Sequence, residues 1–163
     1  MTAVKLFAIV MIALTLSAVT VEGRRNATLH KYNATTIEGT ANRSSSSCSF
    51  SQYTYALQTA CGYVSIHGLW PNGDGCNYCT SEKFDESSLS SDTLAGMNKY
   101  WKSCEGSSSN TDFWSHEWSR HGTCSGMGQE SYFATALQLF NIYSSGCSNG
   151  CELCIDRSSL QQC

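Results

Sequence analysis

The chain has 163 residues, a formal net charge of −3 and ten cysteines, all of which follow residue 47. The negative charge excludes a protein that holds nucleic acid through a broad basic surface and counterion release, so any such contact must be local. This density of cysteines is typical of a small domain in an oxidising compartment, where disulfides supplement a modest hydrophobic core. Up to five disulfides could form.

Residues 1–23 have the pattern of a secretory signal peptide. A lysine precedes an apolar run from Leu6 to about Val19, and small residues follow. Because this run is shorter than the ~20 residues that a membrane-spanning helix needs, we favour a cleaved signal over an anchor. We expect cleavage after Gly23, with Ala18 as the alternative site, and no membrane contact by the mature chain.

Residues 24–47 are rich in Ser, Thr and Asn and contain three N-x-S/T acceptors for glycosylation, at Asn26, Asn33 and Asn42. We interpret this segment as a solvated, glycosylated leader. A disordered linker whose acceptors stay unmodified is the alternative. Residues 48–163 then form one domain.

Alternating polar and apolar residues predict strands near both ends of this domain. The alternation runs over residues 53–57 and returns over 64–66, so two strands precede Gly68. A short last strand over 152–156 follows a turn region rich in Gly, Ser and Cys.

Apolar residues at helical spacing predict three helices between these strands. They cover residues 89–101, 113–122 and 131–143, and Asp112 is the expected N-cap of the second. We therefore expect an α+β fold with a central antiparallel sheet, helices packed on one face and several disulfides.

Two short segments concentrate residue types that are scarce elsewhere in the chain. They read IHGLWPN over residues 66–72 and FWSHEWSRHGTC over residues 113–124, and they hold three of the four histidines. The fourth, His30, lies in the leader, and we assign it no role.

The second segment places four reactive side chains on neighbouring turns of a helix. Glu117 lies four residues before His121, and His116 four before Arg120, so each pair shares a helix face. A carboxylate favours the protonated form of an adjacent imidazole, and a guanidinium offers a cationic fork to phosphate oxygens. A single histidine often has no task, but this cluster and the remote His67 indicate stabilisation of an anionic transition state.

Metal and thiol chemistries fit these spacings less well. A zinc-protease helix needs histidines four residues apart, whereas His116 and His121 point about 140° away from each other. A zinc ribbon built from the Cys-x-x-Cys pairs at 76–79 and 151–154 has tolerable spacing, but secretion favours disulfides. A thiol protease pairing Cys124 with His121 would need residues too close in sequence. We expect no metal.

The two histidine segments, in this order and separation, resemble the paired signatures of the ribonuclease T2 family. The strand YTYALQ at 53–58 is similar to the family's first strand, and the tail at 151–163 to its closing strand and disulfide loop. The resemblance covers most of residues 48–163. Three departures are a short stretch before IHGLWP, the loss of several tens of residues before the closing strand, and Arg120 where lysine is usual.

The resemblance implies an endoribonuclease that requires no metal or other cofactor. His121 would be the general base that removes the 2′-hydroxyl proton, and His67 the general acid that protonates the departing 5′-oxygen. The product would be a 2′,3′-cyclic phosphate that is hydrolysed to a 3′-phosphate. Because the nucleophile belongs to the substrate, we expect cleavage of single-stranded RNA and none of DNA.

Four further residues take supporting roles by the same resemblance. Glu117 and Arg120 would stabilise the pentavalent phosphorane, and His116 would bind the phosphate during catalysis. Trp70 would stack on a base, an interaction that tolerates any base identity, so we expect little base specificity. We expect a monomer.

The resemblance also implies part of the disulfide pattern. Cys124 would pair with Cys79, or with Cys76 as the alternative, and so tie the two histidine segments together. Nearness in sequence adds two further expected bonds, Cys48–Cys61 and Cys154–Cys163.

Two other classes of function stay open at this point. A catalytically inactive, secreted T2-like protein that binds or signals would fit the missing segment, which could spoil the pocket. An unrelated cysteine-rich adhesion module would explain the cysteines but neither histidine segment. The expected location is extracellular, or an acidic compartment such as a lysosome or vacuole, and the acidic pI of about 5.7 favours work at mildly acidic pH.

Overall fold

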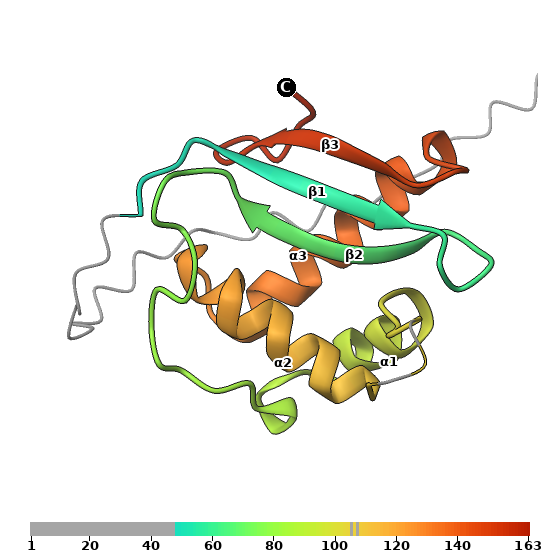
Figure 1. Cartoon of the computed structure of the whole chain (residues 1–163), viewed down its shortest axis with the longest axis horizontal. Helices are drawn as coiled ribbons and strands as arrows, with labels where there is room; N and C mark the ends of the chain where they lie inside the picture. Colours follow the sequence, from blue (N-terminus) through green and yellow to red (C-terminus); the bar gives the residue numbers. More distant parts are fainter. Residues whose placement is uncertain (1–47, 105, 107) are drawn as a thin grey trace, which may run out of the picture. The chain divides into compact units, whose positions relative to one another are not determined.

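The structure, a computed structural model, describes residues 48–104, 106 and 108–163 (Figure 1). The expected signal peptide and leader lie outside these residues. No helix in the described part has the length and apolar character needed to cross a membrane. The strands and helices, in chain order, are β1 (Gln52–Gln58), β2 (Ser65–Pro71), α1 (Ser91–Tyr100), α2 (Asn110–Arg120), α3 (Gln129–Tyr143) and β3 (Cys151–Asp156).

The three strands form one antiparallel sheet with β1 in the middle, in the order β2-β1-β3. Tyr55 of β1 pairs with Leu69 of β2 on one side and with Leu153 of β3 on the other. Figure 1 shows the three helices gathered on one side of this sheet. The predicted α+β fold, with an antiparallel sheet and helices on one face, is confirmed.

Aromatic side chains fill the space between the sheet and the helices. Tyr53, Tyr55 and Leu57 alternate along β1 and are buried, as the sequence pattern predicts. The Tyr55 hydroxyl donates a hydrogen bond of 2.8 Å to the carbonyl of Ala136 in α3, so its polar atom is satisfied inside the core. The largest buried aromatic side chains from the helical layer are Trp101, Trp114, Trp118, Tyr132 and Phe133.

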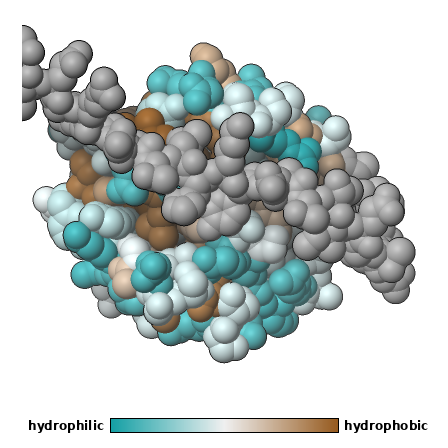
Figure 2. Space-filling model, turned by 180° about the vertical axis from the view of Figure 1, so that it is seen from behind, coloured by the Kyte–Doolittle hydropathy of each residue, from teal (hydrophilic) through white to brown (hydrophobic). Residues whose placement is uncertain are grey.

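The outer surface is mixed. On the face seen in Figure 2, hydrophilic residues cover much of the visible described surface and hydrophobic ones form small groups. The large hydrophobic side chains that stay exposed among the described residues are Tyr63, Tyr78 and Ile142.

One irregularity in the sheet lies beside the first histidine segment. The register between β1 and β2 shifts, because Ala56 pairs with Gly68 whereas Leu57 pairs with Ile66. His67 is therefore the extra residue of a β-bulge. Bulges bend a strand and redirect a side chain, and they are frequent next to active sites.

The helices begin at different residues from those predicted. Ser109, and not Asp112, is the N-cap of α2: its hydroxyl accepts from the Asp112 backbone N–H, and the Asp112 carboxylate accepts from the Ser109 N–H in return. Both residues can cap a helix, and the reciprocal pair moves the start three residues earlier. Similarly, α1 begins after the cap Ser90 and not at Leu89.

All ten cysteines lie in disulfides, so the four cysteines of the zinc-ribbon alternative are not free to bind zinc. The expected bond Cys48–Cys61 is wrong, because the extended strand β1 lies between these residues and keeps them apart. The bonds that do form are Cys48–Cys76, Cys61–Cys104, Cys79–Cys124, Cys147–Cys151 and Cys154–Cys163, of which the third and the fifth agree with expectation.

Candidate active site

The two histidine segments meet where β2 lies beside the C-terminal end of α2. The Trp70 indole joins them: its ring centroid lies 5.2 Å from that of His67 and 5.3 Å from that of His121. His67 projects from the bulge in β2, and His121 is the C-cap of α2. The structure thus brings together two imidazoles that are 54 positions apart in the sequence.

A partly buried hydrogen bond holds Trp70 against α2. Its Nε1 donates to Oε2 of Glu117 over 2.8 Å. Gly68 makes this approach possible, because a Cβ at that position would collide with both Trp70 Nε1 and Glu117 Oε2. The glycine of the first segment is therefore required by close packing. Base stacking on Trp70 stays a prediction.

Glu117 is a buried acid, with only 2 % of its surface exposed. Burial disfavours its ionised form and raises its pKa to about 7, although the hydrogen bond from Trp70 and the positive charge of Arg120 act in the opposite direction. The carboxyl group is thus protonated to a large extent at mildly acidic pH.

We expect Glu117→Gln to stabilise the fold more at pH 8 than at pH 4. The folded-state pKa lies above the unfolded value of about 4.5, so the native state loses stability as pH rises through this interval. Glutamine removes that loss and still accepts the bond from Trp70. The gain in unfolding free energy should differ between the two pH values by about 2–3 kcal/mol, measured by urea unfolding. A gain equal at both pH values would contradict this interpretation, and the exposed Glu152→Gln serves as the control variant.

His121 is half-buried and lies among cations. Burial is the main cause that lowers its pKa to about 3, and the positive charges of Arg120, His116 and His67 contribute to this shift in that order. The imidazole is therefore neutral over most of the pH range and able to accept a proton. His116 itself is exposed on α2.

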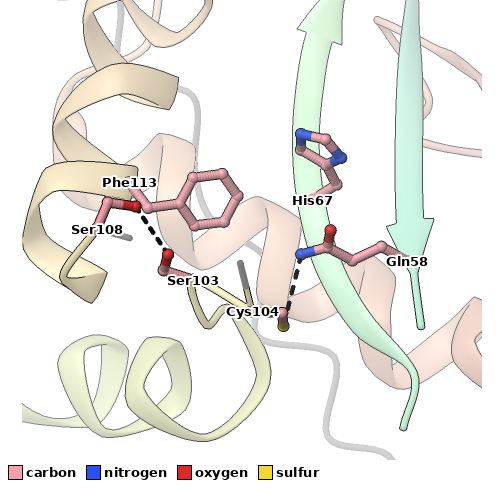
Figure 3. Close-up of a pocket in the computed structure, with 6 residues that line it drawn as sticks. All are labelled: Gln58, His67, Ser103, Cys104, Ser108 and Phe113. Carbon is pink, nitrogen blue, oxygen red and sulfur yellow. Dashed lines mark hydrogen bonds between the residues drawn. The ribbon is translucent and has the colours of Figure 1, made fainter. Parts of the chain in front are cut away.

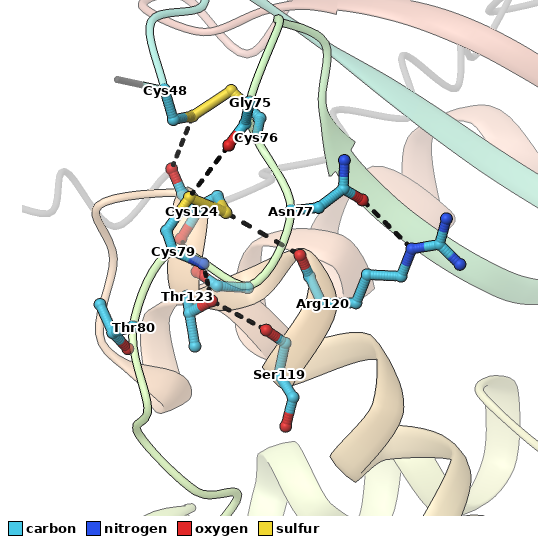
Figure 4. Close-up of a disulfide and its surroundings, with 12 residues drawn as sticks. Cys48, Gly75, Cys76, Asn77, Cys79, Thr80, Ser119, Arg120, Thr123 and Cys124 are labelled. Atoms are coloured by element: carbon cyan, nitrogen blue, oxygen red, sulfur yellow. Dashed lines mark hydrogen bonds between the residues drawn. A yellow bond between two sulfur atoms is a disulfide. The ribbon is translucent and has the colours of Figure 1, made fainter. Parts of the chain in front are cut away.

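A loop after β2 holds Arg120 at the end of α2 (Figure 4). Asn77 Oδ1 accepts from Arg120 Nε over 3.2 Å, and the Tyr78 backbone N–H donates to the Arg120 carbonyl over 2.9 Å. Tyr78 takes a positive φ of 53°, which is uncommon for a bulky residue, next to the disulfide Cys79–Cys124. Asn77 was not predicted from the sequence, although its position two residues before a predicted bridge cysteine was a usable signal.

A pocket opens beside His67 (Figure 3). The Phe113 ring lies 5.7 Å from the His67 ring between centroids, and the Ser103 and Ser108 hydroxyls lie 2.9 Å apart. Sequence reasoning missed most of this lining, because the Cys61–Cys104 disulfide brings it together from separate segments. The residues that line the pocket are Gln58, His67, Ser103, Cys104, Ser108 and Phe113.

The chain is similar to known proteins. The family model described as Ribonuclease T2 family matches residues 30–146. In tomato (Solanum lycopersicum), the intracellular ribonuclease LX is 48% identical over 80 residues, covering 46% of this chain and 33% of LX. The extracellular ribonuclease LE of the same plant is 40% identical over 85 residues, covering 47% of this chain and 36% of LE.

A solved structure is also similar to this chain. RNase MC1 is a protein from the seeds of bitter gourd. The structure of one of its variants in complex with 5′-GMP matches this chain with a TM-score of 0.53 and 29% identity. The match covers 59% of this chain and 60% of that chain. The chain spans about a third of the length of these two tomato relatives. With a family model that matches most of its length, the chain belongs to the ribonuclease T2 family.

Proposed function

We propose that the chain is an endoribonuclease that cleaves single-stranded RNA by transphosphorylation, without a metal ion and with little base specificity. The observation that carries this proposal is the meeting of His67 and His121 around the Trp70 ring. In-line displacement at phosphorus needs a base for the nucleophile and an acid for the leaving group. Two imidazoles from separate elements can supply both.

In the first step, His121 takes the proton of the 2′-hydroxyl as the 2′-oxygen attacks phosphorus. The bond from phosphorus to the 5′-oxygen breaks, and His67 gives its proton to that oxygen. The products are a 2′,3′-cyclic phosphate and a free 5′-hydroxyl. Water then opens the ring to a 3′-phosphate, with the two histidines in reversed roles. The low pKa of His121 supports its role as the base, because it is neutral before the reaction.

Three side chains of α2 would stabilise the phosphorane. Arg120, held at Nε by Asn77, would direct its remaining N–H groups to the phosphate oxygens. Glu117, with its raised pKa, would carry a proton at mildly acidic pH and donate it in a hydrogen bond to a phosphorane oxygen. His116 would bind the phosphate from the exposed side of the helix.

Two features would receive bases. We assign the pocket beside His67 to the nucleoside that departs, because His67 protonates its 5′-oxygen. Trp70, whose indole is fixed by Glu117, would stack on a base near the two histidines.

We expect the rate of cleavage to persist well below pH 6. In kcat/KM the acid side of the pH profile reports the base of the free enzyme, and the pKa of His121 is about 3. Profiles of kcat/KM on a dinucleoside phosphodiester should therefore stay level from pH 6 to about pH 4. A tenfold fall for each pH unit below 6.5 would contradict the assignment of His121 as the base.

The location and processing of the chain belong to the same proposal. We propose that residues 1–23 are removed as a signal peptide and that residues 24–47 form a glycosylated leader at Asn26, Asn33 and Asn42. The mature monomer would act outside the cell or in an acidic compartment. The disulfides of the catalytic domain support an oxidising compartment.

Cleavage of RNA beside DNA tests the proposal. The chain is expressed from its first residue in a secretory host, its thiols are checked for complete oxidation, and a chelator is present throughout. We expect cuts in single-stranded RNA and none in DNA of the same sequence. Cuts in DNA would refute the mechanism, and a folded, oxidised chain that cuts neither would favour the inactive binding or signalling protein.

A further inference from the structure

His67 lies at an unusual point of the sheet. It is the extra residue in the bulge between Ile66 and Gly68, on a strand that pairs with β1 along one edge only. Carbonyl groups on the other edge need partners from elsewhere when they are buried. At His67 that partner is Trp101, whose Nε1 donates to the His67 carbonyl over 2.9 Å.

Trp101 is itself fixed on both sides. It is fully buried and forms the C-cap of α1, where its backbone N–H donates to Met97 over 2.8 Å. Its carbonyl accepts from Nε1 of Trp114 in α2 over 2.6 Å. A continuous series of hydrogen bonds, buried at Trp114 and partly buried at His67, thus runs from α2 through Trp101 to the backbone of His67.

The direction of a carbonyl group restricts the side chain of the same residue. The peptide plane is rigid, so holding the His67 carbonyl restricts ψ at this residue and, because the strand holds the backbone N, also the direction of the Cα–Cβ bond. A bulge lacks the regular ladder that would otherwise set this direction.

We propose that Trp101 is a positioning residue that aims the His67 imidazole through the hydrogen bond to the His67 carbonyl. The inference rests on the proposed function, in which His67 is the general acid. It assigns a task to a buried tryptophan that otherwise reads as core packing alone.

Trp101→Phe removes the donor and keeps an aromatic ring in the core. Two control variants separate this loss from other effects. Tyr132→Phe removes a bond of 2.9 Å to the Leu69 carbonyl, two residues along the same strand. Trp118→Phe removes the same indole volume from the core, but Trp118 Nε1 has no hydrogen-bond partner among the described residues.

Two substrates reveal whether the general acid is displaced. A dinucleoside phosphodiester has a poor leaving group that needs an acid, whereas a uridine 3′-(4-nitrophenyl phosphate) has a good one that does not. For Trp101→Phe we expect kcat to fall about tenfold on the first substrate and less than about twofold on the second, with KM unchanged. Each control variant should change kcat by the same factor on both substrates. An equal loss on both substrates, or no loss, would overturn the proposal.

A second measurement does not depend on cleavage, so it also applies if the proposed function fails. Carbon-13 NMR relaxation of the His67 ring reports its order in the folded chain. We expect the ring to become more mobile in Trp101→Phe and to remain unchanged in both controls. A ring with the same order in all four proteins would refute the role of Trp101. A wild-type chain without ribonuclease activity would instead refute the proposed function.

Discussion

His121→Ala and His67→Ala should each lower the rate of RNA cleavage by about 10²–10⁴-fold, and the double variant should be little worse than either single one. Burial, with a smaller contribution from the charges of its cationic neighbours, lowers the pKa of His121 to about 3, so its imidazole is neutral and can accept the 2′-hydroxyl proton in the proposed mechanism. His67 projects from the bulge beside the pocket, where the proposed mechanism places the departing oxygen.

The measurement is kcat/KM on a dinucleoside phosphodiester at pH 5, with unfolding curves recorded for every variant. His30→Ala is the matched control, because His30 belongs to the expected leader and has no assigned role. Near wild-type cleavage by either variant, in protein shown to be folded, would remove that histidine from the mechanism.

Gly68→Ala should have the second largest effect, on both stability and activity. The added Cβ would collide with Trp70 Nε1 and Glu117 Oε2, which are joined by a bond of 2.8 Å. The Trp70 indole or α2 must move to remove this collision. The contact between the two histidine segments would then be lost. We expect a loss of about 1–3 kcal/mol in unfolding free energy and a fall of about 100-fold in kcat.

Gly146→Ala provides the control for this experiment. A Cβ at Gly146 meets open space among the described residues, so this variant should keep the stability and the activity of the wild type. Indole N–H signals in NMR spectra report the Trp70 bond directly. A Gly68→Ala protein with an unchanged Trp70 signal and full activity would show that the close approach is not required.

The sequence predicted the elements whose patterns are local. The alternation of Tyr53, Tyr55 and Leu57 identifies β1, because one face of the strand packs against the helices. The i,i+4 spacing of Glu117 and His121 likewise places both residues at the end of one helix. These patterns depend on period alone and need no knowledge of distant contacts.

Features that depend on long-range pairing were not predictable in this way. The bulge at His67 arises from the register between two strands, and the only local sign of it is Gly68, whose position inside a strand is also compatible with other irregularities. The partner of Cys48 depends on the path of the loop that ends at Cys76. Nearness in sequence therefore gave the wrong partner for Cys48. The bond from Trp101 to His67 joins residues 34 positions apart, and it forms only because the fold brings the C-cap of α1 to the edge strand β2.

We propose that His67 and His121 of this chain suffice as the acid–base pair for transphosphorylation. Phosphorus-31 NMR of a dinucleoside phosphodiester, incubated with the fully oxidised chain and a chelator, tests it most directly. We expect a 2′,3′-cyclic phosphate signal that appears first and a 3′-phosphate signal that replaces it. A 5′-phosphate product, or cleavage without the cyclic intermediate, would contradict the account.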